Sequence, residues 1–507
     1  MTLATHYIAE PLLEFGNGQK VEHPQDGLFL YGPVVAQGSP KVIHVGIVGT
    51  PNGIALVQQW LTRLNGRIPV ERADQLHTSP WPGFQAAFAM KLESKALVTI
   101  PIGGTIIANA IQRANRYDAV RTTVELFENA ILDHFRTDER RPDVWLVVVP
   151  EVVHKYGRPQ VGAPKDATPS TVLSERTATE ILRGGGSLFD DMTEEAQLYL
   201  FVRNFHHQLK AQLLHKEVVI QVIRETTLNP DLELDRFGNP TRSVQEPARI
   251  AWNFSTTLYF KGARLQPWQL ADVRPRVCYV GLVFKEDPSP KQAGDACCAA
   301  QMFLNSGNGV VFRGALGPWR SPKSREFHLR HDPAKELVGE VIKAYTKDHG
   351  GPPDELFIHA KQRFNPEEWQ GFKAAVPSTT KLVGVRIRPT QDLRLFRPDT
   401  DMPVLRGTAV TMSKREGYLW TTGYVPRLRT YPGFETPKPI LVEINQGDGD
   451  LMIVMRDVLA LTKINYNACD FSSGLPVTLK FADRVGEILT ASPRGMEAPP
   501  MPFRFYI

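Results

Sequence analysis

The residues best suited to chemistry in this sequence are basic and aromatic side chains that are interleaved between residues 381 and 431. The basic ones include Arg386, Arg388, Arg394, Arg397, Arg406, Lys414, Arg415, Arg427 and Arg429, and the aromatic ones are Phe396, Tyr418, Trp420, Tyr424 and Tyr431. Cations that follow phosphates, with rings that stack on bases, are typical of proteins that hold nucleic-acid strands. Acidic residues such as Glu416 dilute the cluster, so a solvated charged face is the alternative interpretation.

The overall charge permits a polyanionic partner but does not require one. The sequence has 59 Lys and Arg against 54 Asp and Glu, a net charge of +5. Its four cysteines show no CxxC spacing, which favours a reduced compartment. The N-terminus has no signal-peptide pattern, and no run approaches the roughly 18 apolar residues of a membrane span. We therefore expect a soluble, cytoplasmic protein with no membrane partner.

The elements that would position these side chains begin with an α/β unit. Residues 41–64 read as strand, turn and helix, and residues 143–150 and 218–223 read as further buried strands. Alternating strands and helices predict a mainly parallel sheet. A helix is predicted from about Asp191 through AQLYLFVRNFHHQLKAQLL, which would place His206 and His207 in its middle, facing the surface or a partner.

The second half predicts a second α/β domain. Residues 276–284 form an apolar run that suits a strand buried on both faces, and a further strand is expected at 355–361. Asn365-Pro-Glu-Glu368 has the cap, first-turn proline and acid that start a helix. At 507 residues the chain suits two domains, which we place at residues 1–265, with an N-terminal segment, and at residues 266–507.

Several segments together resemble a short prokaryotic Argonaute, a MID domain followed by a PIWI domain without the N and PAZ domains of the long forms. They are VVVPEVVHKYGRP (147–159), VIQVIRETTL (219–228), ARIAWNFSTTLYFKGARLQPWQL (248–270), VCYVGLVFK (277–285), ELFIHAKQRF (355–364), TKINYNACDFSSGLPVTLKFAD (462–483) and FRFYI (503–507). The resemblance depends on their order and spacing, since no single segment decides it. It implies a Rossmann-like MID domain at residues 1–265 and an RNase H-like PIWI domain at residues 266–507.

The resemblance implies a pocket for the 5′-phosphate of a guide strand in the MID domain. The matching positions are His154, Lys155, Gln221, Asn253 and Lys261. Lysine charges with a neutral donor suit a phosphate, because each charge-assisted hydrogen bond contributes about 1.5–3 kcal/mol. Taken alone, Lys155 would be a solvated lysine and Gln221 a polar residue at a strand end.

The resemblance further implies a structural Mg²⁺ against that phosphate. Its ligands would be Gln221 and the C-terminal carboxylate, here that of Ile507. The segment FRFYI is apolar enough to be buried, as this role requires. A tail that packs only for stability is the alternative.

In an RNase H-like domain, clustered carboxylates hold two metal ions for cleavage. The positions that match the first two acids carry Val283 and Lys361, and Asp483 matches the last. An ammonium about 4 Å from a dication costs about 8 kcal/mol at an effective dielectric of 20, so Lys361 would exclude the metal. We therefore expect no catalytic residue, with Asp483 paired to Lys361 or Arg484.

The resemblance implies a catalytically inactive sensor rather than a nuclease. It would load a guide RNA, recognise complementary single-stranded DNA, and contact nucleic-acid backbones through Arg386, Arg388, Arg427 and Arg429. Its partner would be an APAZ-containing effector with a sirtuin-like, TIR or nuclease domain, which depletes NAD(P) against plasmids or phage. Oligomerisation on activation is part of this expectation.

Two other functions remain as alternatives. An active RNase H-like guided endonuclease would need acids other than those at the positions of Val283 and Lys361. A Rossmann-type nucleotide-binding enzyme is suggested by KVIHVGIVGTPNG (41–53), but this segment lacks the GxGxxG run and the acid about 20 residues further on.

Overall fold

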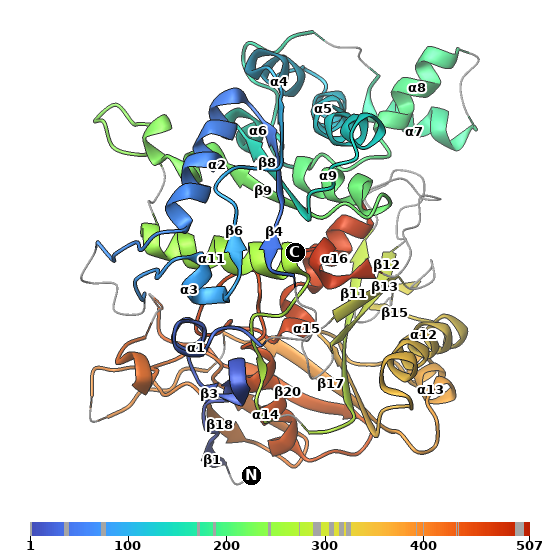
Figure 1. Ribbon diagram of the computed structural model, residues 1–507. Coiled ribbons are helices and arrows are strands. Elements are labelled where there is room, and N and C mark those ends of the chain that lie inside the picture. Colours follow the sequence, from blue (N-terminus) through green and yellow to red (C-terminus); the bar gives the residue numbers. More distant parts are fainter. Residues whose placement is uncertain are drawn as a thin grey trace.

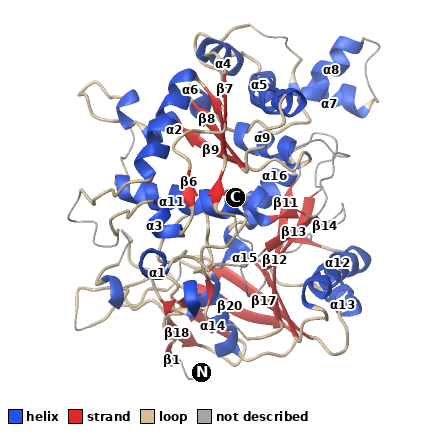
Figure 2. Cartoon of the chain, viewed as in Figure 1, coloured by secondary structure: helices blue, strands red, loops and turns tan. Residues whose placement is uncertain are grey.

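The computed structural model describes residues 3–34, 40–71, 78–169, 173–185, 189–241, 245–272, 274–286, 296–303, 309–313, 319–320, 326–391, 393–398, 400–431, 433, 435–491 and 501–507. Two α/β units, each built around a sheet, make up the molecule (Figure 1). Figure 2 shows helices around both sheets, with α11 (Pro247–Leu258) and α16 (Ala482–Leu489) between them. The described helices include none with the length and apolar character needed to cross a membrane.

The first unit is a four-stranded parallel sheet with the order β7-β5-β8-β9. Its strands are β5 (Val45–Gly49), β7 (Val98–Pro101), β8 (Val144–Val149) and β9 (Ile220–Arg224). All six residues of β8 are buried, and alternate residues enter two different cores. The strand is therefore covered on both faces, as its unbroken apolar run predicts.

Helices cover both faces of this sheet. Those whose apolar residues share a core with Leu146 and Val148 are α2 (Pro51–Leu64) and α11 (Pro247–Leu258). Those that share a core with Val147 and Val149 are α4 (Gly104–Ile111), α5 (Arg116–Thr137) and α9 (Phe205–Leu214). Shorter elements nearby are β4 (Val42–Ile43), α3 (Phe84–Phe88), β6 (Lys91–Leu92), α6 (Glu151–Tyr156), α7 (Glu175–Arg183) and α10 (Glu225–Leu228).

The single helix predicted from Asp191 is wrong, because the structure has two helices there. The first is α8 (Asp190–Leu198), and α9 begins at Phe205. Asn204 starts the second helix because its side chain accepts a hydrogen bond from the backbone N–H of His207 at 3.1 Å. His206 and His207 therefore lie in the first turn of α9 rather than in the middle of a helix.

The second unit is a mixed sheet of ten described strands with the order β1-β18-β19-β20-β17-β16-β11-β12-β13-β21. Its central strands β11 (Val277–Glu286), β16 (Glu355–Ala360) and β17 (Lys381–Pro389) are parallel. The others are β1 (Ala4–Tyr7), β12 (Ala296–Phe303), β13 (Gly309–Arg313), β18 (Thr408–Thr411), β19 (Glu416–Leu419), β20 (Ile440–Gln446) and β21 (Met501–Pro502). Residues of β11 alternate between two cores, which confirms the expectation of a strand buried on both faces.

Helices pack on both faces of this second sheet. One core contains residues of α12 (His331–His349) and α13 (Pro366–Ala375), and the other contains residues of α14 (Leu451–Leu461), α15 (Val477–Lys480) and α16 (Ala482–Leu489). The capping box predicted at Asn365 and Glu368 is present at the start of α13. In the first unit, the side chain of Thr50 caps the start of α2 in a similar way.

The predicted division at residue 265 is wrong for the N-terminal segment. Strand β1 pairs with β18, in the register Ala4 to Thr411, and so belongs to the second sheet. The short strands β2 (Leu13–Glu14) and β3 (Lys20–Val21) pair with each other, and β2 also pairs with β10 (Gln269–Leu270). Helix α1 (Pro24–Tyr31) follows them. Local sequence does not report such pairing because the partner strands lie hundreds of residues away.

Candidate nucleic-acid site

A buried lysine lies at the end of α11. The helix continues into a π-helical turn, η3 (Tyr259–Ala263), which contains Lys261. The ammonium of Lys261 donates to the backbone oxygen of Ile220 at 3.0 Å and to Oε1 of Gln221 at 2.5 Å. Its side chain has no exposed surface. Single π-helical turns are rare and often occur at functional sites.

A second buried lysine lies on α9. Lys210 is 4% exposed, and its ammonium donates to the backbone oxygens of Tyr506 at 3.1 Å and Ile507 at 2.5 Å. His206 lies one helical turn before Lys210, on the same side of α9. The chain end is thus bound to the first unit, and in Figure 1 it lies between the two sheets. We define the phosphate cluster as His206, Lys210, Gln221 and Lys261.

The phosphate cluster is electrostatically prepared for an anion. Burial lowers the pKa of Lys210 to about 7, with a further contribution from the charge of Arg484. Burial also lowers the pKa of Lys261 well below its usual value, and the charge of Lys210 adds to the effect. The pKa of His206 is lowered by burial and by both lysines. Burial and mutual repulsion disfavour the charged forms of these three side chains. A bound anion would favour the charged forms again and so raise the three pKa values.

The structure brings together only part of the predicted phosphate pocket. Gln221 and Lys261 are in direct contact, and Ile507 is bound by Lys210, whose charge acts on Lys261. Asn253 lies two turns before Lys261, and its side chain accepts a hydrogen bond from the backbone N–H of Cys469 at 2.8 Å. Asn253 therefore links α11 to the second unit.

His154 and Lys155 lie on α6, at the other end of the sheet strands. His154 is 3.6 Å from Glu151, whose carboxylate is paired with Arg224 at the end of β9. Gln221 lies three residues before Arg224, a distance of roughly 10 Å along a strand. Lys155 is exposed, with its ammonium 5.2 Å from the ring centroid of Tyr156. The structure does not join either residue to the phosphate cluster.

Sequence reasoning missed His206 and Lys210. The signal that could have found them is a histidine and a lysine spaced by four residues at the start of a helix, with Gln221 on the next strand. That spacing puts both side chains on one helix face.

The predicted ligands of Mg²⁺ do not fit a divalent cation by themselves. Oε1 of Gln221 and the backbone oxygen of Ile507 each accept a hydrogen bond from a lysine ammonium. Within the described residues no group of three or more His, Cys, Asp or Glu side chains is placed to hold a metal ion. Two ammonium groups at this place favour an anion over a cation. The Mg²⁺ therefore stays a prediction, and it would need phosphate oxygens as further ligands.

A cavity of about 400 Å³ lies beside the phosphate cluster, and His207 is one of its lining residues. Tyr117 and Tyr199 line it with ring centroids 4.4 Å apart, and the guanidinium of Arg203 lies 5.2 Å from the ring of Tyr117. Residues of the second unit, including Lys285 on β11 and Glu487 on α16, close its other side.

The positions of the expected metal-binding acids meet at one end of the second sheet. Gly281 on β11 pairs with His359 on β16, so Val283 and Lys361 continue neighbouring parallel strands by two residues each. Lys285 is 3.0 Å from Glu487, which ties α16 to β11, and Asp483 lies one turn before Glu487. The side chains of Val283 and Asp483 lie outside the described residues, so the predicted pairing of Asp483 stays a prediction.

The four arginines expected on the nucleic-acid backbone fall into two places. Arg386 and Arg388 lie two residues apart on β17, where Arg386 is 3.3 Å from Glu443 and Arg388 is exposed. Arg427 and Arg429 belong to a turn after β19, where Arg427 is 2.6 Å from Asp26 of α1 and Arg429 is exposed.

Comparison with known proteins identifies the fold. No family model and no curated protein matches the sequence. Clostridium butyricum Argonaute, in a structure with a guide DNA (5′ deoxycytidine) and a 19-mer target DNA, is 12% identical, with a TM-score of 0.61 over 98% of this chain and 54% of that chain. Aa-Ago with externally-bound siRNA is 15% identical, with a TM-score of 0.55 over 99% and 56%. A. aeolicus Argonaute is 16% identical, with a TM-score of 0.55 over 97% and 54%.

The molecule therefore has an Argonaute-like α/β fold, in which the first unit corresponds to MID and the second to an RNase H-like PIWI domain. The chain spans about half the length of these structures. At such low identity the likeness establishes the fold alone.

Proposed function

We propose that this chain holds a 5′-phosphorylated guide RNA by its terminal phosphate in the phosphate cluster. The observation that carries the proposal is the pair of buried lysines, Lys210 and Lys261, from α9 and η3. A terminal phosphate carries nearly two negative charges and accepts several hydrogen bonds, which these ammonium groups supply. The neighbouring cavity of about 400 Å³ would receive the first nucleoside.

The guide would then recognise complementary single-stranded DNA by base pairing. The protein supplies shape and positive charge, while the guide supplies the sequence. Support comes from the solved neighbours, of which one holds a guide DNA with a target DNA and another an externally bound siRNA. Exposed arginines such as Arg388 and Arg429 would contact the backbones.

The chain would bind its target without cutting it. Two-metal cleavage needs carboxylates at the strand ends, and this chain has the hydrocarbon of Val283 and the ammonium of Lys361 there. A response would then require a separate effector, and the family resemblance suggests an APAZ-containing protein that depletes NAD(P) in cells invaded by plasmids or phage. Assembly into oligomers on activation belongs to the same proposal.

The direct test measures the affinity of the purified chain for one RNA with a 5′-phosphate and with a 5′-hydroxyl. We expect the phosphate to strengthen binding at least tenfold, since one charge-assisted hydrogen bond contributes about 1.5–3 kcal/mol. Equal affinities would contradict the proposal. End-labelling of nucleic acid that co-purifies with the chain, and identification of co-purifying protein, would test guide and effector separately.

A cleavage assay tests the proposal that the chain does not cut its target. With a guide and a complementary DNA target we expect no product with Mg²⁺ or Mn²⁺, because the ammonium of Lys361 repels a second cation at this sheet end. The measurement is a denaturing gel of end-labelled target, with an active guided nuclease as positive control in the same buffers. One cut at a fixed position opposite the guide would refute the expectation.

A further inference from the structure

Glu487 on α16 joins the two units beside the phosphate cluster. Its Oε2 lies 3.4 Å from Nε2 of His207 on α9, and its Oε1 lies 3.0 Å from Nζ of Lys285 on β11. Figure 1 shows α16 next to α9, between the two sheets, and the two helices are in contact. One carboxylate of the second unit is therefore shared by a strand of its own sheet and by the helix that carries His206 and Lys210.

The start of α9 carries both this contact and part of the phosphate cluster. Adjacent residues of a helix point about 100° apart, so a contact that fixes His207 also fixes the direction of His206. Lys210 follows three residues after His207 and donates to the backbone oxygens of Tyr506 and Ile507, at the end of the second unit. The directions of both cluster side chains therefore depend on how α9 lies against the second unit.

Three cations also face this part of α9, and they repel one another. Burial lowers the pKa of His207 to about 4; the charge of Glu487 opposes this shift, and the charges of Lys210, Lys285 and Arg484 add to it. Arg484, on α16, also lowers the pKa of Lys210. Removing the carboxylate of Glu487 would leave Lys210 facing two cations of the second unit, and their repulsion would push α9 away from α16.

We propose that Glu487 is a positioning residue for the guide phosphate, which holds α9 against the second unit so that His206 and Lys210 face the bound phosphate. This proposal rests on the proposed function, because it needs a 5′-phosphate in the cluster. It predicts the opposite sign from simple electrostatics. A nearby carboxylate repels a phosphate, so its removal would strengthen phosphate binding if charge alone mattered, whereas loss of positioning weakens phosphate binding.

The test measures the affinity for one RNA with a 5′-phosphate and with a 5′-hydroxyl, in the unaltered chain and in Glu487→Gln. We expect the ratio of the two affinities to fall about tenfold in Glu487→Gln, the effect of losing one charge-assisted hydrogen bond to the phosphate. The affinity for the 5′-hydroxyl RNA and the urea midpoint should change little, because partly exposed ion pairs contribute little to stability. A ratio that rises or stays the same would overturn the proposal.

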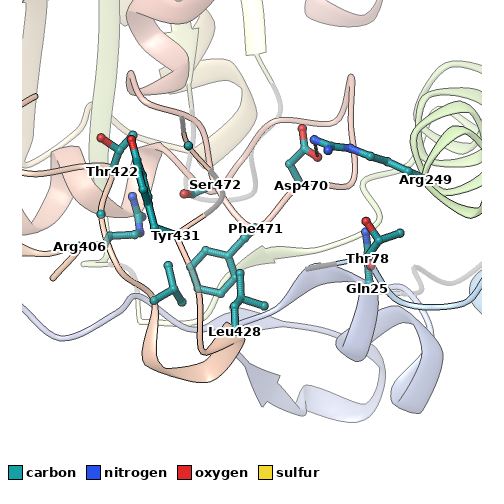
Figure 3. A pocket seen from close by; sticks show the side chains of 13 residues that line it. Gln25, Thr78, Arg249, Arg406, Thr422, Leu428, Tyr431, Asp470, Phe471 and Ser472 are labelled. Atoms are coloured by element: carbon teal, nitrogen blue, oxygen red, sulfur yellow. Dashed lines mark hydrogen bonds and ion pairs between the residues drawn. The ribbon is translucent and has the colours of Figure 1, made fainter. Parts of the chain in front are cut away.

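The matched control is Asp470→Asn. Asp470 is also a carboxylate of the second unit that pairs with a cation of the first, since it lies 3.1 Å from Arg249 on α11. Figure 3 shows the two side chains pointing toward each other, beside a separate cavity of about 230 Å³. The side chain of Asp470 is 38% exposed, against 32% for Glu487. Asp470→Asn should leave the ratio unchanged. An equal fall in both variants would show a general loosening of the two units and overturn the proposal.

A charge swap separates the two contacts of Glu487. The double substitution Lys285→Glu with Glu487→Lys keeps an ion pair between β11 and α16 but places an ammonium group before His207. We expect the ratio of affinities to stay low in this variant. A restored ratio would show that Glu487 acts only by holding α16 on β11, and it would overturn the positioning of α9.

A double-mutant cycle tests whether Glu487 acts through His207. His207→Ala should lower the ratio as Glu487→Gln does, and the combined variant should lower it no further, because both substitutions break one contact. Additive effects of the two substitutions would contradict the proposal while leaving the proposed function intact. If the unaltered chain showed no preference for the 5′-phosphate, the proposed function itself would be refuted.

Discussion

Replacing Glu10 by alanine is expected to destabilise the folded chain by about 3–5 kcal/mol, because it leaves two buried cations without their carboxylate. Glu10 accepts hydrogen bonds from Nε of Arg406 and Nζ of Lys463, both at 2.8 Å. The side chains of Arg406 and Lys463 are 2% and 0% exposed. This ion group joins the N-terminal segment to the second unit. The measurement is the midpoint of urea denaturation.

The matched control is Asp272→Ala. Asp272 also links the N-terminal segment to the second unit, through Lys20 at 2.8 Å, but the two side chains are 69% and 43% exposed. An exposed pair contributes at most about 1 kcal/mol, so the urea midpoint of this variant should lie close to that of the unaltered chain. Equal effects of the two substitutions would refute the buried ion group as a structural link.

The same ion group gives a pH dependence. Burial raises the pKa of Glu10, but Arg406 and Lys463 outweigh burial and hold it below its usual value. A carboxyl group whose pKa is lowered by folding stabilises the fold above its unfolded pKa of about 4.3. We expect this contribution to be complete at neutral pH and to be lost as the pH falls below about 4. In Glu10→Ala, the free energy of unfolding should therefore fall less steeply as the pH is lowered below about 4.

Replacing Lys261 by methionine is expected to weaken binding of a 5′-phosphorylated RNA by about ten- to a hundredfold, since it removes one charge-assisted contact of about 1.5–3 kcal/mol. The affinity for the same RNA with a 5′-hydroxyl should change little, because that end carries no phosphate. Methionine approximates the length of lysine and suits a buried position, so the fold should persist. Fluorescence anisotropy with both RNAs measures the ratio of affinities.

Two further lysines make this experiment specific. Lys216, exposed just after α9, is the matched control, and Lys216→Met should leave the ratio of affinities unchanged. Lys155→Met tests whether the phosphate binds at the predicted position on α6 rather than at the phosphate cluster, which includes Lys261 of η3. If Lys155→Met abolished the phosphate preference while Lys261→Met did not, the phosphate would bind at α6 and our assignment would be wrong.

Local patterns predicted many of the elements. The apolar run within residues 276–284 identified a strand buried on both faces, and Asn365 with Glu368 identified the start of α13. Such features depend on neighbours within a few residues. The same reasoning missed α5. It also missed the break between α8 and α9, because Asn204 resembles any other polar residue until its N-cap hydrogen bond is seen.

The sequence by itself determined the class of fold and the residue types at the expected metal-binding positions, because buried strands, helix caps and the identities of Val283 and Lys361 are readable without coordinates. Only the tertiary structure decided which basic residues meet. Lys210 reaches Ile507 across 297 residues, and Glu10 reaches Lys463 across 453. The physical reason is that burial and charge pairing depend on contacts between distant segments, whereas sequence patterns report the preferences of near neighbours.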